Sequence, residues 1–177
     1  MRYNGRRENG TGRAALTDRR FTGLDGAELS EMMMLSHSKT LENILLNRRE
    51  KPGCSPVCLP MIPQVRMTRR LEGRYVMDIA EMNKKFSDSV GKFGDWRKRG
   101  PSYDLPFSVL IGKKVDNLVC AGRCISVTDA MWDVTRVIPV CAVSGEAAGA
   151  AAAMCSDFSC IDIAKLQDHL KKNGVYI

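Results

Sequence analysis

VDNLVCAGRCIS, residues 115–126, is the stretch on which the interpretation of the whole chain depends. Its apolar run, residues 117–121, predicts a short strand, and Gly122 and Arg123 follow where a tight turn is expected. Glycine lets the backbone approach another group closely because it has no Cβ atom. An arginine guanidinium can neutralise an anion through paired hydrogen bonds. The stretch therefore predicts a strand that ends in a turn able to meet an anionic group.

Two helical segments follow this turn, the shorter at residues 128–134 and a longer, alanine-rich one at residues 137–156. Pro139 fits the first turn of the longer helix, where its missing N–H costs nothing. That helix has a nearly smooth face of small residues, which are Ala142, Ser144, Gly145, Ala148, Gly149 and Ala152. Such a face suits close packing on a sheet and equally suits a flat ligand, and the pattern leaves both open. Because a helix N-terminus carries partial positive charge, the unit as a whole fits a flat cofactor that bears phosphate.

The composition is that of one globular domain or a part of a larger protein, with 177 residues, 44% of them apolar and 27% charged. The net charge is +7, but the basic residues lie in small scattered groups and are not interleaved with the few aromatic residues. No apolar run approaches the roughly 20 residues that span a bilayer, and residues 1–13 lack the apolar region of a signal peptide. We therefore expect a cytoplasmic protein without membrane or nucleic-acid partners, with a small basic nucleic-acid-binding module as the minor alternative.

The chain has seven cysteines, an odd number, and this predicts reduced thiols rather than a disulfide framework. Cys54 with Cys58, and Cys120 with Cys124, have CxxxC spacing, whereas zinc sites typically use CxxC pairs. Cys120 lies in the predicted strand, so we interpret it and Cys124 as packing residues. No metal site is expected.

The N-terminal third contains one helical pattern and one misleading motif. Residues 25–49 are predicted to form a helix with Asp25 as N-cap, Glu28 in a capping box and a buried apolar stripe. Residues 10–15 match G-x-G-x-x-A, but residues 1–9 cannot form the buried strand that a dinucleotide site requires. This match is therefore interpreted as accidental.

The remaining segments are predicted from turn signals and apolar runs. Residues 57–76 are expected to be extended, Asp78 to cap a short helix, and residues 87–102 to form a loop before a strand at residues 102–111. A last helix is expected after Asp162, ending at an Asn-Gly pair.

The motifs of the C-terminal half occur in the same order in one known family. YDLPF at residues 103–107 corresponds to that family's YDIPY, and VDNLVCAGRCIS corresponds to VDNLLVAGRCIS. RVIPVC at residues 136–141 matches an RV-Pro-x-C turn, and the following GEAAG matches GQAAG. VRMTRRLEGRYVMD at residues 65–78 is similar to VRESRRIVGEYVLT. From about residue 22 to its end, the chain resembles the FAD-dependent oxidoreductases with a two-part FAD-binding fold.

The resemblance implies a mixed α/β (α+β) fold and FAD as the cofactor. The chain would be the C-terminal part of an FAD/NAD(P)-binding-type fold with part of its substrate-side sheet. The first Rossmann βαβ unit, whose G-x-G-x-x-G holds the ADP half of FAD, would be missing. Residues 1–22 would be an irregular, strand-like remnant and residues 23–111 a partial substrate-side region. Residues 112–177 would be the C-terminal part of the FAD-binding domain with a terminal packing helix.

The same resemblance implies which residues contact the cofactor. Gly122 and Arg123 would serve its phosphate and ribitol region, and Ser126 would lie near the isoalloxazine. The helix start, with Arg136 and Pro139, would direct its dipole at the flavin.

Further along that helix, small residues would lie beside the cofactor, namely Gly145, Ala148 and Gly149. Glu146 replaces the family's glutamine and would bring a carboxylate close to the helix start. Arg66 and Arg69 match arginines of the substrate side and would hold an anionic group, with surface salt bridging as the alternative.

The expected function follows from these implications. The chain would be a C-terminal fragment of an FAD-dependent oxidoreductase that contributes the flavin- and ribitol-side half of the FAD site. Its partners would be an unidentified small-molecule substrate and a separate N-terminal FAD-binding half, and the isolated chain would be inactive and bind FAD weakly. A non-catalytic truncated remnant, or a mis-started gene product, is the alternative.

Overall fold

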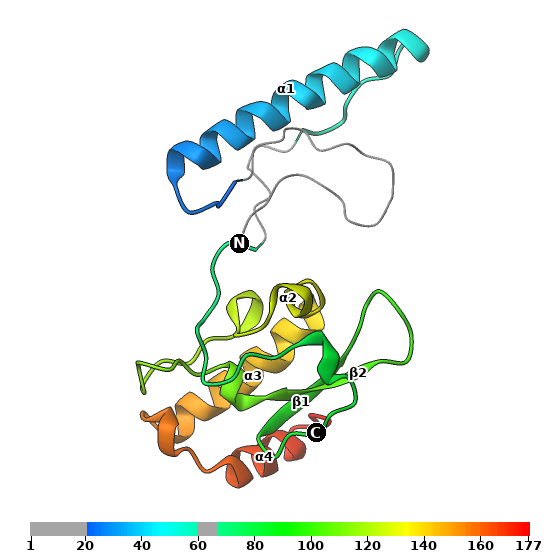
Figure 1. The fold of residues 1–177 in the computed structure, drawn as a ribbon. Helices are drawn as coiled ribbons and strands as arrows, with labels where there is room; N and C mark the ends of the chain where they lie inside the picture. Colours follow the sequence, from blue (N-terminus) through cyan, green and yellow to red (C-terminus); the bar gives the residue numbers. More distant parts are fainter. Residues whose placement is uncertain (1–20, 60–66) are drawn as a thin grey trace. The chain divides into compact units, whose positions relative to one another are not determined.

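The structure is a computed structural model that describes residues 21–59 and 67–177 (Figure 1). The chain divides into two compact units, Met1–Arg69 and Arg70–Ile177. The second unit contains the glycine-arginine turn and every strand of the described residues. Residues 70–111 belong to this unit together with residues 112–177.

The first unit is built on one long helix, α1, Gly26–Glu50. Asp25 caps it as predicted, because its side chain accepts a hydrogen bond from the Glu28 N–H at 2.9 Å. The Glu28 carboxylate accepts from the N–H groups of Thr22 and Gly23 at 2.8 and 2.9 Å, which fixes the chain before the helix. The predicted buried stripe is wrong beyond Met32, the one buried residue of α1, since Leu41 and Leu45 are about half exposed.

The second unit contains an antiparallel pair of strands, β1 Ser89–Gly94 and β2 Ser102–Pro106, with a bulge between Ser89 and Lys92. The sequence predicted a loop where β1 lies, and this prediction is wrong. Val90 and Phe93 are buried, and the Phe93 ring stacks on Tyr103 of β2 with ring centroids 5.5 Å apart. Burial of these side chains stabilises a strand in a segment whose glycines and lysine do not favour one.

The strand predicted at residues 102–111 is shorter than expected, because a 3₁₀ turn, Phe107–Val109, follows β2 directly. The apolar run at residues 117–121 does not form a full strand, since it pairs only through the isolated bridge between Val119 and Ile111. Cys120 continues this contact by donating its N–H to the Leu110 carbonyl at 2.7 Å. The run is thus held extended beside residues 110–111.

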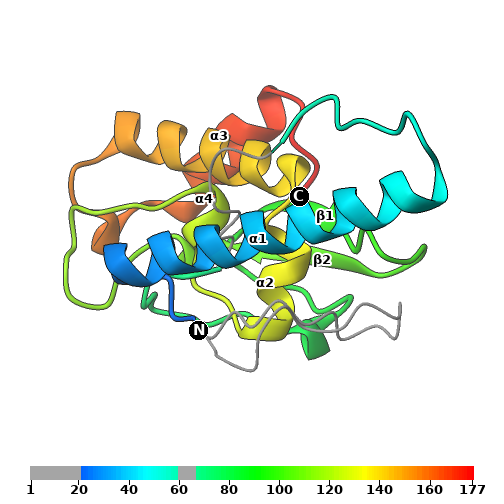
Figure 2. The ribbon, with the colours of Figure 1, turned by 90° about the horizontal axis from the view of Figure 1, so that it is seen from above.

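Three helices complete the second unit, namely α2 Asp129–Thr135, α3 Ile138–Met154 and α4 Ile163–Lys172. α3 packs on β1 and on α4, and Figure 2 shows α3 and α4 side by side. Asp162 caps α4 as predicted, and Asp78 caps a single 3₁₀ turn, Ile79–Glu81, instead of a longer helix. The centre of the unit is formed by buried side chains that include Met77, Tyr103, Leu105, Phe107, Trp132 and Leu166.

The four α-helices of the described residues differ in length and in apolar content. Within residues 21–59 and 67–177, none of them alone combines the length and apolar composition that a membrane crossing needs. α2 and α3 satisfy both only as a pair, which is bent by 91°.

Candidate functional site

The site begins with the turn at Gly122. Residues Gly122–Cys124 form a 3₁₀ turn, and Gly122 adopts φ 78°, a left-handed conformation that other L-residues rarely adopt. The Gly122 N–H donates to the Ser144 hydroxyl at 2.9 Å, and that hydroxyl donates in turn to the Val140 carbonyl at 2.7 Å. Ser144 is fully buried in α3, so the turn is fixed to the flank of that helix.

Arg123 is exposed and reaches from the turn to the junction between α2 and α3. Its Nε donates to the Arg136 carbonyl at 3.2 Å, and its own carbonyl accepts from the Trp132 indole N–H at 2.6 Å. In the described part of the chain, the two terminal nitrogens of this guanidinium have no hydrogen-bond partner. The side chain is therefore held at its base and presents its charged end to solvent.

The N-terminus of α3 lies at this junction without a side-chain cap. Val137 occupies the N-cap position and makes no side-chain hydrogen bond, Pro139 lies in the first turn as predicted, and Ile138 is 77% exposed. The backbone N–H groups of an uncapped first turn carry the positive end of the helix dipole. Arg136 precedes them, but its guanidinium binds Asp133 at 3.0 Å, so much of its charge is already neutralised.

The small-residue face of α3 divides between the interior and the surface. Ala148 is buried, together with Ser144, Ala147 and Ala151, on the side that packs on the rest of the unit. Gly145 and Gly149 are exposed, and a Cβ atom added to either would meet no atom within 4 Å. Close packing therefore accounts for one side of this face, and the other side is open to solvent, where a flat ligand remains a prediction. Glu146 is also exposed.

Ser126 occupies the interior of the unit. It is 1% exposed, and its hydroxyl oxygen accepts from the Gly73 N–H at 3.0 Å. A Cβ on Gly73 would lie 2.5 Å from the Ser126 Cβ, so a side chain at position 73 would force these two segments apart. This geometry gives Ser126 a packing role, and a role near the isoalloxazine remains a prediction.

Arg66 and Arg69 are the two arginines that the sequence predicted on the substrate side. Arg66 lies outside the described residues. Arg69 donates to the Leu24 carbonyl at 3.2 Å, which fastens the end of the unit to the segment before α1. Neither is placed relative to Gly122 and Arg123.

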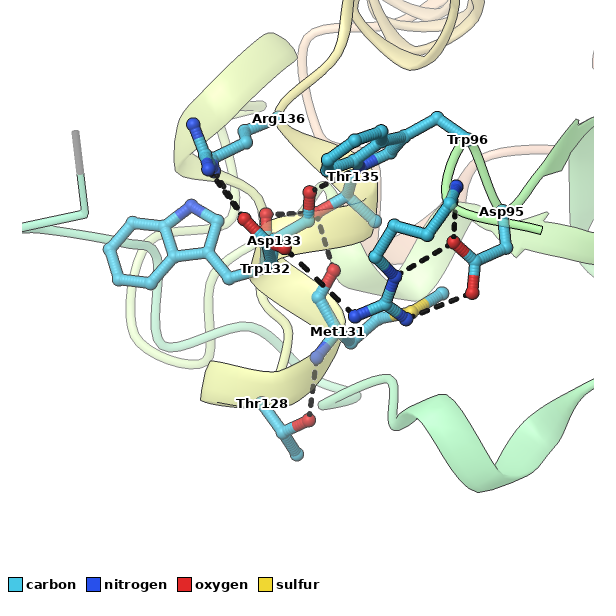
Figure 3. A network of polar contacts seen from close by, with 9 residues as sticks. Asp95, Trp96, Thr128, Met131, Trp132, Asp133, Thr135 and Arg136 are labelled. Atoms are coloured by element: carbon cyan, nitrogen blue, oxygen red, sulfur yellow. Dashed lines mark hydrogen bonds and ion pairs between the residues drawn. The ribbon is translucent and has the colours of Figure 1, made fainter. Parts of the chain in front are cut away.

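A charged network that the sequence did not predict supports the α2–α3 junction (Figure 3). Asp95, buried after β1, accepts two hydrogen bonds from the Arg97 guanidinium at 2.8 Å each, and these bonds lower its pKa to about 2. Arg97 also approaches Asp133 of α2 at 3.9 Å. The Trp96 indole N–H donates to the Asp133 carbonyl at 3.0 Å. In the sequence, the Asp-Trp-Arg run at residues 95–97 could have indicated this network. Its partner, Asp133 of α2, lies far away in the sequence, so the contact could not be predicted.

The chemistry of the site is that of binding an anion. All seven cysteines are free thiols, and no three His, Cys, Asp or Glu side chains among residues 21–59 and 67–177 are grouped so as to hold a metal ion. A guanidinium whose terminal nitrogens face solvent beside an uncapped helix N-terminus is suited to bind a phosphate group. The fold is mixed α/β, and the charge at this junction is suited to an anionic group.

Comparison with known protein families makes the assignment specific. The family model described as FAD dependent oxidoreductase matches residues 5–170, and the chain belongs to this family. The family's cofactor is FAD, which confirms the resemblance and the cofactor predicted from the sequence. No curated protein and no solved structure matches the chain.

Proposed function

We propose that the second unit provides the flavin- and ribitol-side half of an FAD site in an oxidoreductase. The observation that carries the proposal is the convergence of Arg123 and the uncapped first turn of α3 at one junction. Hydrogen bonds fix Arg123 through its carbonyl and its Nε, which leaves its two terminal nitrogens to solvent, and the first turn of α3 has no side-chain cap. The site is therefore preorganised for an anionic group.

The residues fit FAD in two further respects. The exposed glycines of α3, Gly145 and Gly149, leave room for a flat ring system to approach the helix backbone. The terminal nitrogens of Arg123 are suited to donate to phosphate oxygens or ribitol hydroxyls. The Gly122 N–H is occupied by Ser144, so in this proposal Gly122 shapes the turn instead of binding the phosphate itself.

FAD, when bound, supplies the electron-transfer chemistry of the family, and the chain supplies position and charge. The dipole of α3 favours negative charge close to its first turn. Glu146 lies one turn and a half further along the exposed side and would oppose that charge if it approached the ring. The substrate is proposed to be a small molecule, and the ADP end of FAD is proposed to be held by a separate N-terminal half.

Binding experiments with parts of the cofactor test this proposal. FMN carries the flavin, ribitol and one phosphate, whereas AMP carries the adenosine and the other phosphate of FAD. We expect the chain to bind FMN and FAD weakly and with similar affinity, measured by flavin fluorescence, and AMP not to compete. Submicromolar FAD binding, or competition by AMP, would contradict a site that is only the flavin-side half.

The contribution of Arg123 is tested by Arg123→Ala, with Arg99→Ala, an exposed arginine of the β1–β2 loop, as the matched control. A lost charge-assisted hydrogen bond costs about 1.5–3 kcal/mol, so Arg123→Ala should weaken FMN binding roughly 10- to 100-fold. Arg99→Ala should leave it unchanged. If the chain is instead a non-catalytic remnant, neither the parent chain nor its variants should bind FMN. The parent chain should then also unfold without a cooperative transition.

A further inference from the structure

The helix α1 has one covered side and one side that faces solvent. Buried or partly buried residues recur three or four positions apart along it and so share one side, and they include Leu29, Met32, Met33, Ser36, Thr40 and Ile44. A second series recurs at the same spacing on another side and consists of Met34, Ser38, Leu41 and Leu45. Its three apolar members are 63%, 57% and 48% exposed. These four residues form an apolar stripe that α1 presents to solvent.

The spacing of this stripe is that of a seam along which two helices pair. Its members are separated by four, three and four positions, the alternation with which the a and d residues of a heptad repeat face a partner helix. The alternation continues for one step at each end, to Glu31 before Met34 and to Arg48 after Leu45. Both of these charged side chains are exposed. The seam thus has a mostly apolar middle, a carboxylate at its N-terminal end and a guanidinium at its C-terminal end.

The seam is complementary to itself when its direction is reversed. Reversal about the point midway between Lys39 and Thr40 brings every position of the seam onto another position of the seam. The facing pairs are then Glu31 with Arg48, Met34 with Leu45, and Ser38 with Leu41. In a two-fold symmetric dimer each pair occurs twice, because a residue of one copy meets its counterpart on the other copy and the reverse holds as well. Apolar side chains would meet along the middle, with a small serine next to the axis and opposite charges at both ends.

The charges of α1 favour antiparallel over parallel pairing. Glu28 lies in the first turn, and Arg48 and Arg49 lie in the last turn. Arg48 is held at this end because its Nε donates to the Cys54 carbonyl at 3.2 Å. Antiparallel pairing brings the acidic first turn of one helix to the basic last turn of the other, whereas parallel pairing in register would place Arg48 beside Arg48. Because exposed ion pairs contribute little free energy, the charges select the direction and the apolar residues supply the affinity.

We propose that α1 pairs with α1 of a second copy of this chain, antiparallel and about a two-fold axis between residues 39 and 40. The same stripe is used by both copies, so the interface is isologous. From Glu31 to Arg48 the seam is about 26 Å long, and a single pair of helices of this length makes a small interface. The dimer is therefore reversible, and its population depends on protein concentration. The pairing uses no residue of the candidate site, so it is independent of the proposed cofactor.

Sedimentation equilibrium of the full chain under reducing conditions tests the pairing. We expect the average mass to rise with concentration from that of one chain towards that of two. Leu45→Gln removes two leucines from each seam-paired dimer and should raise its dissociation constant at least roughly 10-fold. Leu46→Gln is the matched control, because Leu46 is 53% exposed but lies about 100° further around the helix, and glutamine preserves the helix in both variants. A chain that stays monomeric up to about 1 mM, or an equal effect of the two variants, would overturn the proposal.

Cross-linking of the dimer, followed by mass spectrometry of its peptides, tests the direction of pairing. A link from one lysine to the same lysine can arise only from two chains. Lys39 is exposed and lies next to the proposed axis, so a short amine-reactive cross-linker should join it to Lys39 of the second copy. Lys51, directly after α1, would lie roughly 35 Å along the helix axis from its own counterpart and should not self-link. Parallel pairing would link both lysines to themselves, so a Lys51 self-link, or a dimer without the Lys39 self-link, would contradict antiparallel pairing.

Discussion

Gly122→Ala and Gly145→Ala replace two glycines of the same site and are expected to change stability in opposite directions. Gly122 has φ 78°, and an alanine in this conformation costs about 1–2 kcal/mol. The added Cβ would lie 3.9 Å from the Cys141 sulfur, an ordinary van der Waals contact, so no steric penalty is added. The expected loss from Gly122→Ala is therefore about 1–2 kcal/mol and arises from the backbone alone.

Gly145 lies inside α3, where an added Cβ would meet no atom within 4 Å. Glycine in a helix interior is less favourable than alanine by about 0.5–1 kcal/mol. Gly145→Ala should therefore stabilise the protein by that amount. If Gly145 borders the flavin, the same variant should weaken FMN binding, so stability and binding would change in opposite senses.

The assay is urea unfolding followed by tryptophan fluorescence. The chain has two tryptophans, Trp96 and Trp132, and both belong to the second unit, so the signal reports on that unit without contribution from the first. The urea concentration at the midpoint of unfolding is compared between variants. Where the dependence of the unfolding free energy on urea is unchanged, the shift of the midpoint gives the change in the free energy of unfolding. A neutral Gly122→Ala, or a destabilised Gly145→Ala, would refute the geometry on which the site is built.

Two other contacts give predictions of similar sharpness. Asp95→Asn removes the carboxylate that Arg97 binds and should destabilise the second unit by roughly 1–2 kcal/mol at pH 7, less than the pKa shift alone suggests because Arg97 is one-third exposed. Because the folded pKa of Asp95 is lowered to about 2, its contribution is complete above the unfolded pKa near 3.8 and is lost as the pH falls towards 2, so the variant should show a flatter acid limb in urea midpoints between pH 5 and pH 2. Gly73→Ala places a Cβ 2.5 Å from the Ser126 Cβ and should lower the thermal midpoint by several degrees. Gly112→Ala is the control, because its Cβ would make only an ordinary contact, 3.6 Å from Leu71 Cδ1. An unchanged midpoint for Gly73→Ala would contradict the packing of Ser126.

Local signals predicted the helix starts well, because a cap depends on residues within one turn. Asp25 and Asp162 both accept the hydrogen bonds expected of N-caps. Strand prediction failed where contacts with distant residues determine whether a segment forms a strand. β1 forms through the burial of Val90 and Phe93, although its glycines and lysine suggested a loop, and the apolar run at residues 117–121 pairs at a single bridge.

The sequence contains the residues of the candidate site in a recognisable order, but it does not reveal the contacts that support them. The Gly-Arg pair and the small-residue helix are visible in the sequence, and the family match agrees with the cofactor that they suggested. The hydrogen bond from Gly122 to Ser144 joins residues 22 positions apart, and the contact between Arg123 and Arg136 joins residues 13 apart. No local pattern encodes such pairs, because the way in which α2 turns the chain back onto the Gly122 turn determines them.

These supports determine how the second unit presents Arg123 to solvent. Ser144 fixes the turn from α3, and Trp132 fixes the Arg123 carbonyl from α2, so two helices set the position of one guanidinium. Asp133 in turn neutralises Arg136, which would otherwise repel Arg123 at the same junction. Asp133 is tied to the β1–β2 loop through Arg97 and Trp96. A perturbation at Asp95, far along the chain from Gly122, should therefore alter how the second unit presents Arg123, because both belong to one connected network of polar contacts.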